Sequence, residues 1–439
     1  MNAVPDREGR PGFVSALRFW LKLGLISFGG PAGQIAIMHR ELVETRRWIS
    51  ERSFLHALNF CMLLPGPEAQ QLATYLGWRL HGIKGGVAAG VLFILPGALV
   101  LYGLSWLYME GGQLPWLAAI FHGLMPAVIA IVADAIRRIG RKALKSPALW
   151  LVALSSFIAI FLFHVSFVLI VLAAAALGGW GHSLWPRQFP SAAGHREDVD
   201  TLNGDIEVLP PVLVPVWWRQ LTVAGCVLVL WWLPIFGLAI WLGWSSVPVQ
   251  QGLFFSKAAL VTFGGAYAVL PYIAQQAVET YGWLSHEQMM AGLALAETTP
   301  GPLILVLQFV GFIGGWQMQG EWSPMLAATI GASITTWATF LPSFLFVLAG
   351  APFIERLGEL KRISAAMTTI TAALVGVMLN LSLVFTLHAV WRDGFGVDWF
   401  VVVAAIAAYA ALAVRRLGMV RVIAVCALAG WAYWLLLGT

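Results

Sequence analysis

The chain has 439 residues, of which 59% are hydrophobic and only 11% are charged. Soluble domains usually carry about 25% charged residues, so this composition excludes a soluble protein and indicates an all-α, multi-pass protein of the lipid bilayer. The net charge of +5 does not indicate a nucleic-acid partner, because the basic residues cluster in short loops between apolar runs, as membrane topology requires.

The first predicted element is a helix that ends at a pair of glycines. A polar N-terminus precedes this helix, which we expect over residues 13–28. Gly29 and Gly30 end it, and Pro31 is suited to the first position of the next helix. The chain therefore turns sharply at Phe28-Gly29-Gly30-Pro31.

A second turn follows at Pro65-Gly66-Pro67, between two short apolar segments at residues 54–64 and 69–80. Each segment is too short to span a bilayer, which takes about 20 residues. Non-helical backbone is tolerated at membrane depth where it lines a cavity or is buried in protein. We therefore predict two re-entrant helical hairpins in this part of the chain.

The rest of the chain contains longer apolar segments and one polar stretch. Spanning helices are predicted at residues 87–108, 117–133, 148–179 (two short spans that turn near His164), 221–244, 325–350, 365–388, 399–414 and 422–437. The resulting domains are an N-terminal half (1–180), a cytoplasmic linker (181–219), a connecting transmembrane helix (220–245) and a C-terminal half (246–439).

The two halves are copies of one another. A shift of 235 positions superimposes residues 22–67 on residues 257–302 without a gap, and 14 of these 46 positions are identical. Further on, a shift of 246 aligns Leu95-Pro96 with Leu341-Pro342, so the second copy contains 246 − 235 = 11 additional residues. Duplicated units of this size in an apolar chain are typical of transporters.

The basic residues predict opposite orientations for the two halves. Four arginines lie within residues 36–61 of the first copy, whereas the matched segment 271–296 has no Arg or Lys. Conversely, segment 109–115 of the first copy has no Arg or Lys, whereas its counterpart 355–362 in the second copy has three such residues. Because Arg and Lys mark cytoplasmic loops, we predict an inverted-topology repeat with a cytoplasmic N-terminus.

The motifs also resemble those of a known family. Phe28-Gly29-Gly30-Pro31, the run from Pro65 to Gly77, and Leu95-Pro96 are similar to the chromate ion transporter family in its long, two-domain form. The resemblance covers both halves. It implies an inner-membrane, secondary active exporter of chromate, a sulfate-like dianion, and no cofactor. The second copy departs from the pattern, with Ala266 in place of Pro31 and Leu303 in place of Glu68.

Other functions remain open alternatives. A passive anion channel or a transporter of another oxyanion, such as sulfate, fits the same composition. An intramembrane enzyme is disfavoured, because the sequence lacks metal-ligand spacing and Gly-x-Ser-x-Gly, and Cys61, Cys226 and Cys426 stand alone. The expected partners are the oxyanion and the lipid bilayer, and a homodimer is left open.

The hairpin tips are the predicted substrate site. A helix N-terminus offers unpaired N–H groups and about half a positive charge, and successive glycine N–H groups can form an anion-binding nest. The alternative is that these residues merely permit tight helix packing. The predicted substrate-binding residues are Lys22, Phe28, Gly29, Gly30, Pro31, Pro65, Gly66, Pro67, Glu68, Lys257, Phe263, Gly264, Gly265, Pro300, Gly301 and Pro302.

Two glutamates are expected to have different roles. Glu68 lies in the first turn of a helix, where a carboxylate is favourable. Glu297 lies near a helix C-terminus, where a charge is unfavourable unless it is protonated or paired, so we predict that Glu297 couples transport to protons. We therefore expect the first copy to hold the anion and the second to sense the gradient. Asp134 is expected to pair with Arg137 and Arg138.

Overall fold

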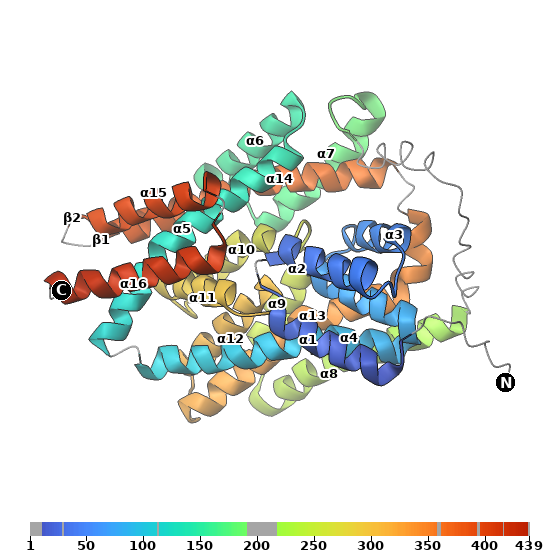
Figure 1. Ribbon diagram of the computed structural model, residues 1–439, viewed down its shortest axis with the longest axis horizontal. Coiled ribbons are helices and arrows are strands. Elements are labelled where there is room, and N and C mark those ends of the chain that lie inside the picture. Colours follow the sequence, from blue (N-terminus) through green and yellow to red (C-terminus); the bar gives the residue numbers. More distant parts are fainter. Residues whose placement is uncertain are drawn as a thin grey trace.

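The protein is described by a computed structural model, which covers residues 11–28, 30–111, 114–190, 217–357, 361–392, 396–415 and 417–437. These residues form helices, apart from loops and one short antiparallel ribbon of β1 (Trp391–Arg392) and β2 (Gly396–Val397). The predicted all-α class is therefore confirmed for the described chain (Figure 1).

The first half consists of seven α-helices and a short π-helix. Their bounds are α1 (Phe13–Ile26), α2 (Gly30–His39), π-helix η1 (Arg40–Thr45), α3 (Glu51–Cys61), α4 (Glu68–Gly111), α5 (Pro115–Ala143), α6 (Pro147–Phe163) and α7 (Phe167–Leu184). As expected, α6 and α7 turn at His164, which has left-handed backbone angles (φ +50°).

The connecting helix and the second half follow. Their bounds are α8 (Trp217–Leu242), α9 (Val247–Leu260), α10 (Ala266–Ala274), π-helix η3 (Gln275–Thr280), α11 (His286–Thr298), the 3₁₀ turn η4 (Leu303–Leu305), α12 (Val306–Gln317), α13 (Pro324–Leu357), α14 (Lys361–Val390), α15 (Trp399–Ala413) and α16 (Met419–Leu437).

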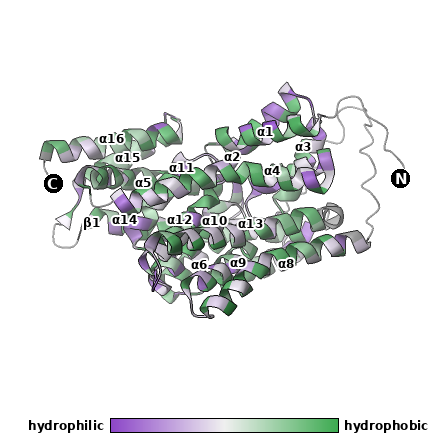
Figure 2. Ribbon diagram, turned by 90° about the horizontal axis from the view of Figure 1, so that it is seen from below, coloured by the Kyte–Doolittle hydropathy of each residue, from purple (hydrophilic) through white to green (hydrophobic). Residues whose placement is uncertain are grey.

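Seven described helices are long and apolar enough to cross a membrane, namely α4, α5, α7, α8, α13, α14 and α16. Helices α6 and α15 are apolar but shorter. Large apolar side chains face outward, such as Ile240 and Leu436, which are 88% and 83% exposed. Figure 2 shows hydrophobic residues along most of α4, α8 and α16. Side chains of this kind are stable on an outer surface when lipid surrounds it, so the protein is a multi-pass membrane protein.

The duplication is visible in the secondary structure. The π-helix η1 begins at Arg40 and η3 at Gln275, which is 40 + 235, and both are six residues long. Ser50 caps α3 and Ser285, again 235 positions later, caps α11, each accepting a backbone N–H three residues on. Serine side chains satisfy N–H groups that the first helical turn leaves free. The similar sequences of the two halves therefore form similar local structures.

The last helices of each half pack against the other half. Helices α6 and α7 pack on α14, whereas α15 and α16 pack on α5. Figure 1 shows α5, α15 and α16 at one end of the long axis, and α1 and α3 at the other. Glycines permit this contact: a Cβ on Gly123 would lie 2.4 Å from the Cys426 carbonyl oxygen, and one on Gly376 would lie 2.0 Å from that of Ala153.

The structure refines the predicted boundaries. The segments expected at 69–80 and 87–108 both lie on α4, which is interrupted between them where His81 and Gly82 leave helical geometry. Helix α7 continues to Leu184, beyond the expected start of the linker at residue 181. Residues 191–216 of that linker lie outside the described residues.

Candidate functional site

The glycine motifs of the two halves meet at two backbone hydrogen bonds. The Gly66 N–H donates to the Thr262 carbonyl oxygen at 2.7 Å, and the Gly301 N–H donates to that of Ser27 at 2.8 Å. Gly301 is 66 + 235 and Thr262 is 27 + 235, so the two bonds are equivalent. A contact that repeats reciprocally in this way is typical of a two-fold axis between the partners.

Each Phe-Gly-Gly motif therefore lies beside the Pro-Gly-Pro motif of the opposite half. We define the first composite site as the α2 N-terminus (Ser27 to Gln34) with the loop at Gly301. The second composite site is the α10 N-terminus (Thr262 to Tyr267) with the segment Gly66 to Glu68. In the described conformation, the N–H groups of Gly66 and Gly301 are occupied by these bonds and are not available to an anion.

The first composite site carries uncharged polar groups. The Gln34 side-chain amide donates to the Gly301 carbonyl oxygen. The Ser27 hydroxyl oxygen and Gln34 Oε1 are buried and have no hydrogen-bond partner among the described residues. Gly30 has φ +74°, and a Cβ built on it would have no other atom within 4 Å. Open space thus lies before the α2 N-terminus, while Gly29 lies outside the described residues.

The second composite site carries a carboxylate at the same place. Gly264 and Gly265 have φ +76° and +92°, and Gly265 is the N-cap of α10. The Glu68 Oε1 atom lies 3.9 Å from the position of a Cβ on Gly265. The first composite site has Leu303 at the position that matches Glu68. A carboxylate beside a helix N-terminus is electrostatically favourable, so the end of α10 would stabilise the ionised form of Glu68.

Glu297 also lies close to the N-terminal end of α10. It is on the last turn of α11, as predicted, and is only 5% exposed. The Tyr267 hydroxyl, on the first turn of α10, donates a hydrogen bond to Glu297 Oε1. The matched residues of the first half are Ala32 and Met62, which have no polar side-chain group that could form this bond.

The sequence prediction missed Tyr267. A signal for it was present, because a tyrosine follows the second glycine pair where the first copy has Ala32. A buried tyrosine hydroxyl usually has a hydrogen-bond partner, and Glu297 is a carboxylate of the same motif region. The proximity of Glu68 to Gly265 could not be seen in the same way, because these residues are 197 positions apart (265 − 68).

Comparison with known proteins identifies the family. The sequence profile described as "Chromate transporter" matches residues 14–180 and 249–431, one segment in each half. The chain belongs to the chromate transporter family. Its members are transporters rather than enzymes. No solved structure matches the chain significantly.

Several relatives align with this chain. The chromate transport protein of Pseudomonas aeruginosa is 35% identical over 382 residues, which cover 86% of this chain and 81% of the relative. The chromate transport protein of Cupriavidus metallidurans is 29% identical over 376 residues, which cover 85% of this chain and 82% of the relative. The uncharacterized transporter YwrB of Bacillus subtilis is 29% identical over 142 residues, which are 72% of YwrB but only 32% of this chain.

The two lysines at matched positions of the repeat lie away from the buried motif contacts. Lys22 is exposed and its Nζ atom lies 3.7 Å from the Glu41 carboxylate. Lys257 is exposed as well. Their substrate role therefore stays a prediction without a supporting contact. The expected pairing of Asp134 is confirmed, with 2.6 Å to Arg137 and 2.8 Å to Arg138.

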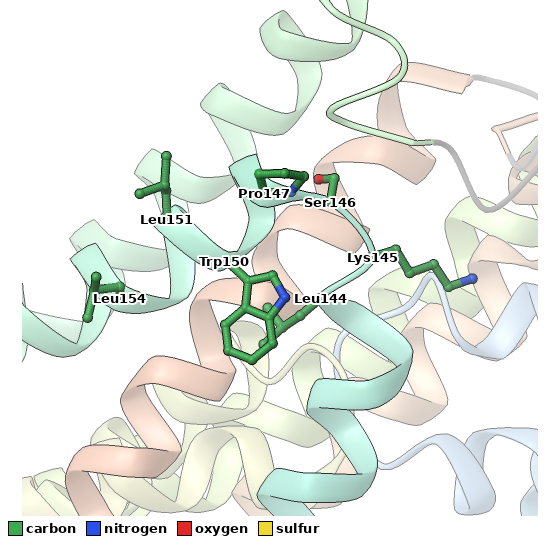
Figure 3. A pocket seen from close by; sticks show the side chains of 7 residues that line it. All are labelled: Leu144, Lys145, Ser146, Pro147, Trp150, Leu151 and Leu154. Atoms are coloured by element: carbon green, nitrogen blue, oxygen red, sulfur yellow. The ribbon is translucent and has the colours of Figure 1, made fainter.

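Two hollows lie elsewhere on the described surface. One, of about 760 Å³, is an apolar depression at the start of α6, and Figure 3 shows Trp150, Leu151 and Leu154 beside it, with the Lys145 ammonium group extending away. The other, of about 370 Å³, lies between the end of α4 and the starts of α5 and α11. No motif residue lines either of these hollows. The described residues contain no group of three or more side chains suited to a metal ion.

We predict that Gly97→Ala destabilises the contact between the halves. A Cβ on Gly97 would lie 2.0 Å from the Pro300 carbonyl oxygen, so α4 or the Gly301 loop must move. Overpacking of this kind typically costs about 1–3 kcal/mol. Thermal unfolding of the detergent-purified protein should therefore occur at a lower temperature. Gly103→Ala is the control on the same helix, because a Cβ there meets nothing within 4 Å. An equal effect of both substitutions would contradict this account of the contact.

Proposed function

We propose that the protein is a secondary active exporter of chromate in the inner membrane, driven by a proton gradient. The observation that carries this proposal is its similarity, over both halves, to proteins named chromate transport protein. The paired motifs at the centre support it, because re-entrant or broken helices typically hold substrate and coupling ion in transporters built from repeats.

The anion is proposed to bind at the first composite site. This site offers the N-terminus of α2, the unpartnered Ser27 hydroxyl and open space beside Gly30. A helix N-terminus and a hydroxyl both donate hydrogen bonds to an oxyanion. No carboxylate of the described residues occupies this site, whereas Glu68 occupies the second one. A dianion would be repelled by that carboxylate, which favours the first site.

The proton is proposed to bind at the second composite site. Glu68 and Glu297 both lie around the N-terminus of α10, and the first composite site has leucine and methionine at the matched positions. Buried carboxylates within membrane proteins often serve as proton carriers. The two halves thus cooperate in both sites, with the anion and the proton kept apart.

Chromate uptake into inverted membrane vesicles tests the function. A pH gradient, acid inside the vesicle, should accelerate uptake, and an uncoupler should return the rate to the basal value. Currents that follow only the electrical gradient, with no response to an imposed pH gradient, would favour an anion channel. Stronger transport of sulfate than of chromate under the same gradient would favour a different oxyanion substrate.

Inverted halves with re-entrant hairpins are the proposed topology, and they predict a labelling pattern. The reciprocal Gly66 and Gly301 bonds support a two-fold relation between the halves. The N-terminal ends of α5 and α14 are matched (115 + 246 = 361) and should face opposite sides. A cysteine in place of Leu114 should therefore react with an impermeant reagent from the periplasmic side, and one in place of Lys361 from the cytoplasmic side.

This labelling needs a background without other exposed thiols. Cys226 is exposed and should be replaced by Ser, whereas Cys61 and Cys426 are buried. Reaction of both introduced cysteines from the same side would rule out the inverted repeat.

A further inference from the structure

The hydrogen bond from Tyr267 to Glu297 joins the two motif segments of the second half. Tyr267 lies two residues after Gly265, on the first turn of α10, and Glu297 lies three residues before Pro300. Both side chains are buried. Because the first half has Ala32 and Met62 here, its two motif segments lack the equivalent bond. The bond is a specific feature of the half that contains the predicted proton carrier.

Helix α5 brings charged side chains to this pair from the other half. The charge of Arg138 acts on both Glu297 and Tyr267, and that of Asp134 acts on Tyr267. Arg138 is itself held by the Asp134 carboxylate at 2.8 Å. Helix α5 packs against α11, which carries Glu297, and in this way the first half brings charged groups near the pair. Arg137 also pairs with Asp134.

We propose that Tyr267 and Arg138 are the positioning residues that stabilise the deprotonated form of Glu297 and transmit its protonation state to the N-terminus of α10. This inference rests on the proposed proton coupling. A deprotonated carboxylate attracts the Tyr267 hydroxyl strongly, since hydrogen bonds to ionised groups are about twice as strong as neutral ones. It also attracts the positive charge of Arg138. Protonation weakens both attractions.

The consequence is a mechanical link to the second composite site. Tyr267 is on the turn that follows Gly265, whose left-handed backbone lies beside Glu68. When protonation of Glu297 releases Tyr267, this first turn of α10 loses one of its side-chain anchors. The opposite half supplies Arg138, so the same event also weakens an attraction between the halves. Alternating access in repeat transporters requires a change of this kind between repeats.

Tyr267→Phe and Arg138→Gln test the inference. Both remove a group that favours the deprotonated carboxylate, so Glu297 should remain protonated to higher pH. The midpoint of the pH profile of transport is measured at equal pH on both sides with an imposed potential. It should rise by about one pH unit in Tyr267→Phe, the size expected for losing one hydrogen bond to a charged group, and should rise in Arg138→Gln as well. A purely structural role would lower the rate without moving the midpoint.

Two neighbouring substitutions serve as matched controls. Tyr272→Phe removes another buried hydroxyl of α10, one that contacts no carboxylate among the described residues. Arg137→Gln removes the other arginine that pairs with Asp134. Both should keep the wild-type midpoint. A midpoint that is unchanged in Tyr267→Phe and Arg138→Gln, or shifted equally in the controls, overturns the inference.

The outcome for Glu297→Gln separates this inference from the proposed function. If Glu297→Gln abolishes the response to a pH gradient while Tyr267→Phe keeps the wild-type midpoint, Glu297 carries the proton and only the positioning role is wrong. If Glu297→Gln responds to the gradient like the wild type, the proposed coupling itself is wrong.

Discussion

Gly30→Leu is expected to abolish chromate transport while leaving the protein folded and inserted. The new side chain would enter the open space before the α2 N-terminus, where we propose that the anion binds. Because a Cβ on Gly30 has no other atom within 4 Å, the new side chain starts in open space and not against a neighbouring atom. Its cost to folding is the left-handed backbone (φ +74°), which is about 1–2 kcal/mol for a residue with a Cβ. Chromate uptake into inverted vesicles and the yield of membrane-inserted protein are the measurements.

Two control variants separate the blocked space from the backbone strain. Gly30→Ala carries the same strain with almost no bulk and should retain much of the transport rate. Gly103→Leu adds the same bulk to a glycine of α4 that also has no close neighbour, and it should transport normally. A normal rate in Gly30→Leu would show that the anion does not pass this point. A rate lost equally in Gly30→Ala would assign the effect to the backbone.

The local structure of the motif region could be predicted well from the sequence. The gap-free shift of 235 predicts that residues 22–67 and 257–302 fold alike, and the structure has matched π-helices at Arg40 and Gln275 and matched serine caps at Ser50 and Ser285. Helix ends and caps depend on a few neighbouring residues, so a repeated sequence repeats them. The same reasoning placed Glu297 at a helix C-terminus.

The pairing between the halves could not be predicted in this way. A repeat shows which segments are alike, but it does not show which copy each segment contacts. We therefore expected a separate role for each half, whereas Gly66 bonds to Thr262 and Gly301 to Ser27. For the same reason, the sequence did not predict that α6 and α7 of the first half pack on α14 of the second. Nor did it predict that α15 and α16 of the second half pack on α5 of the first. Only long-range packing decides between contacts within a copy and contacts between copies.

This pairing changes the roles that we predicted for the two halves. The expectation was that the first copy holds the anion and the second senses the gradient. In the structure, Glu68 comes from the first half but lies beside Gly265 of the second. The acidic groups therefore gather at one composite site, although they come from both halves. We propose that anion binding and proton binding are divided between the two composite sites and not between the two halves. Electrostatic effects depend on distance in space, whichever half a charged residue comes from.

Glu297→Gln is expected to leave chromate binding nearly unchanged and to remove the acceleration of transport by a pH gradient. The amide resembles the protonated carboxyl in shape, and it still accepts a hydrogen bond from Tyr267, but it cannot release a proton. Binding should persist because the proposed anion site contains no group of Glu297. The measurements are chromate binding to the purified protein and uptake into inverted vesicles with and without a pH gradient. Glu287→Gln, on the first turn of the same helix, is the control and should keep the gradient response. A Glu297→Gln variant that still responds to the gradient like the wild type would make this carboxylate structural, and Glu68→Gln would then be the next variant to test.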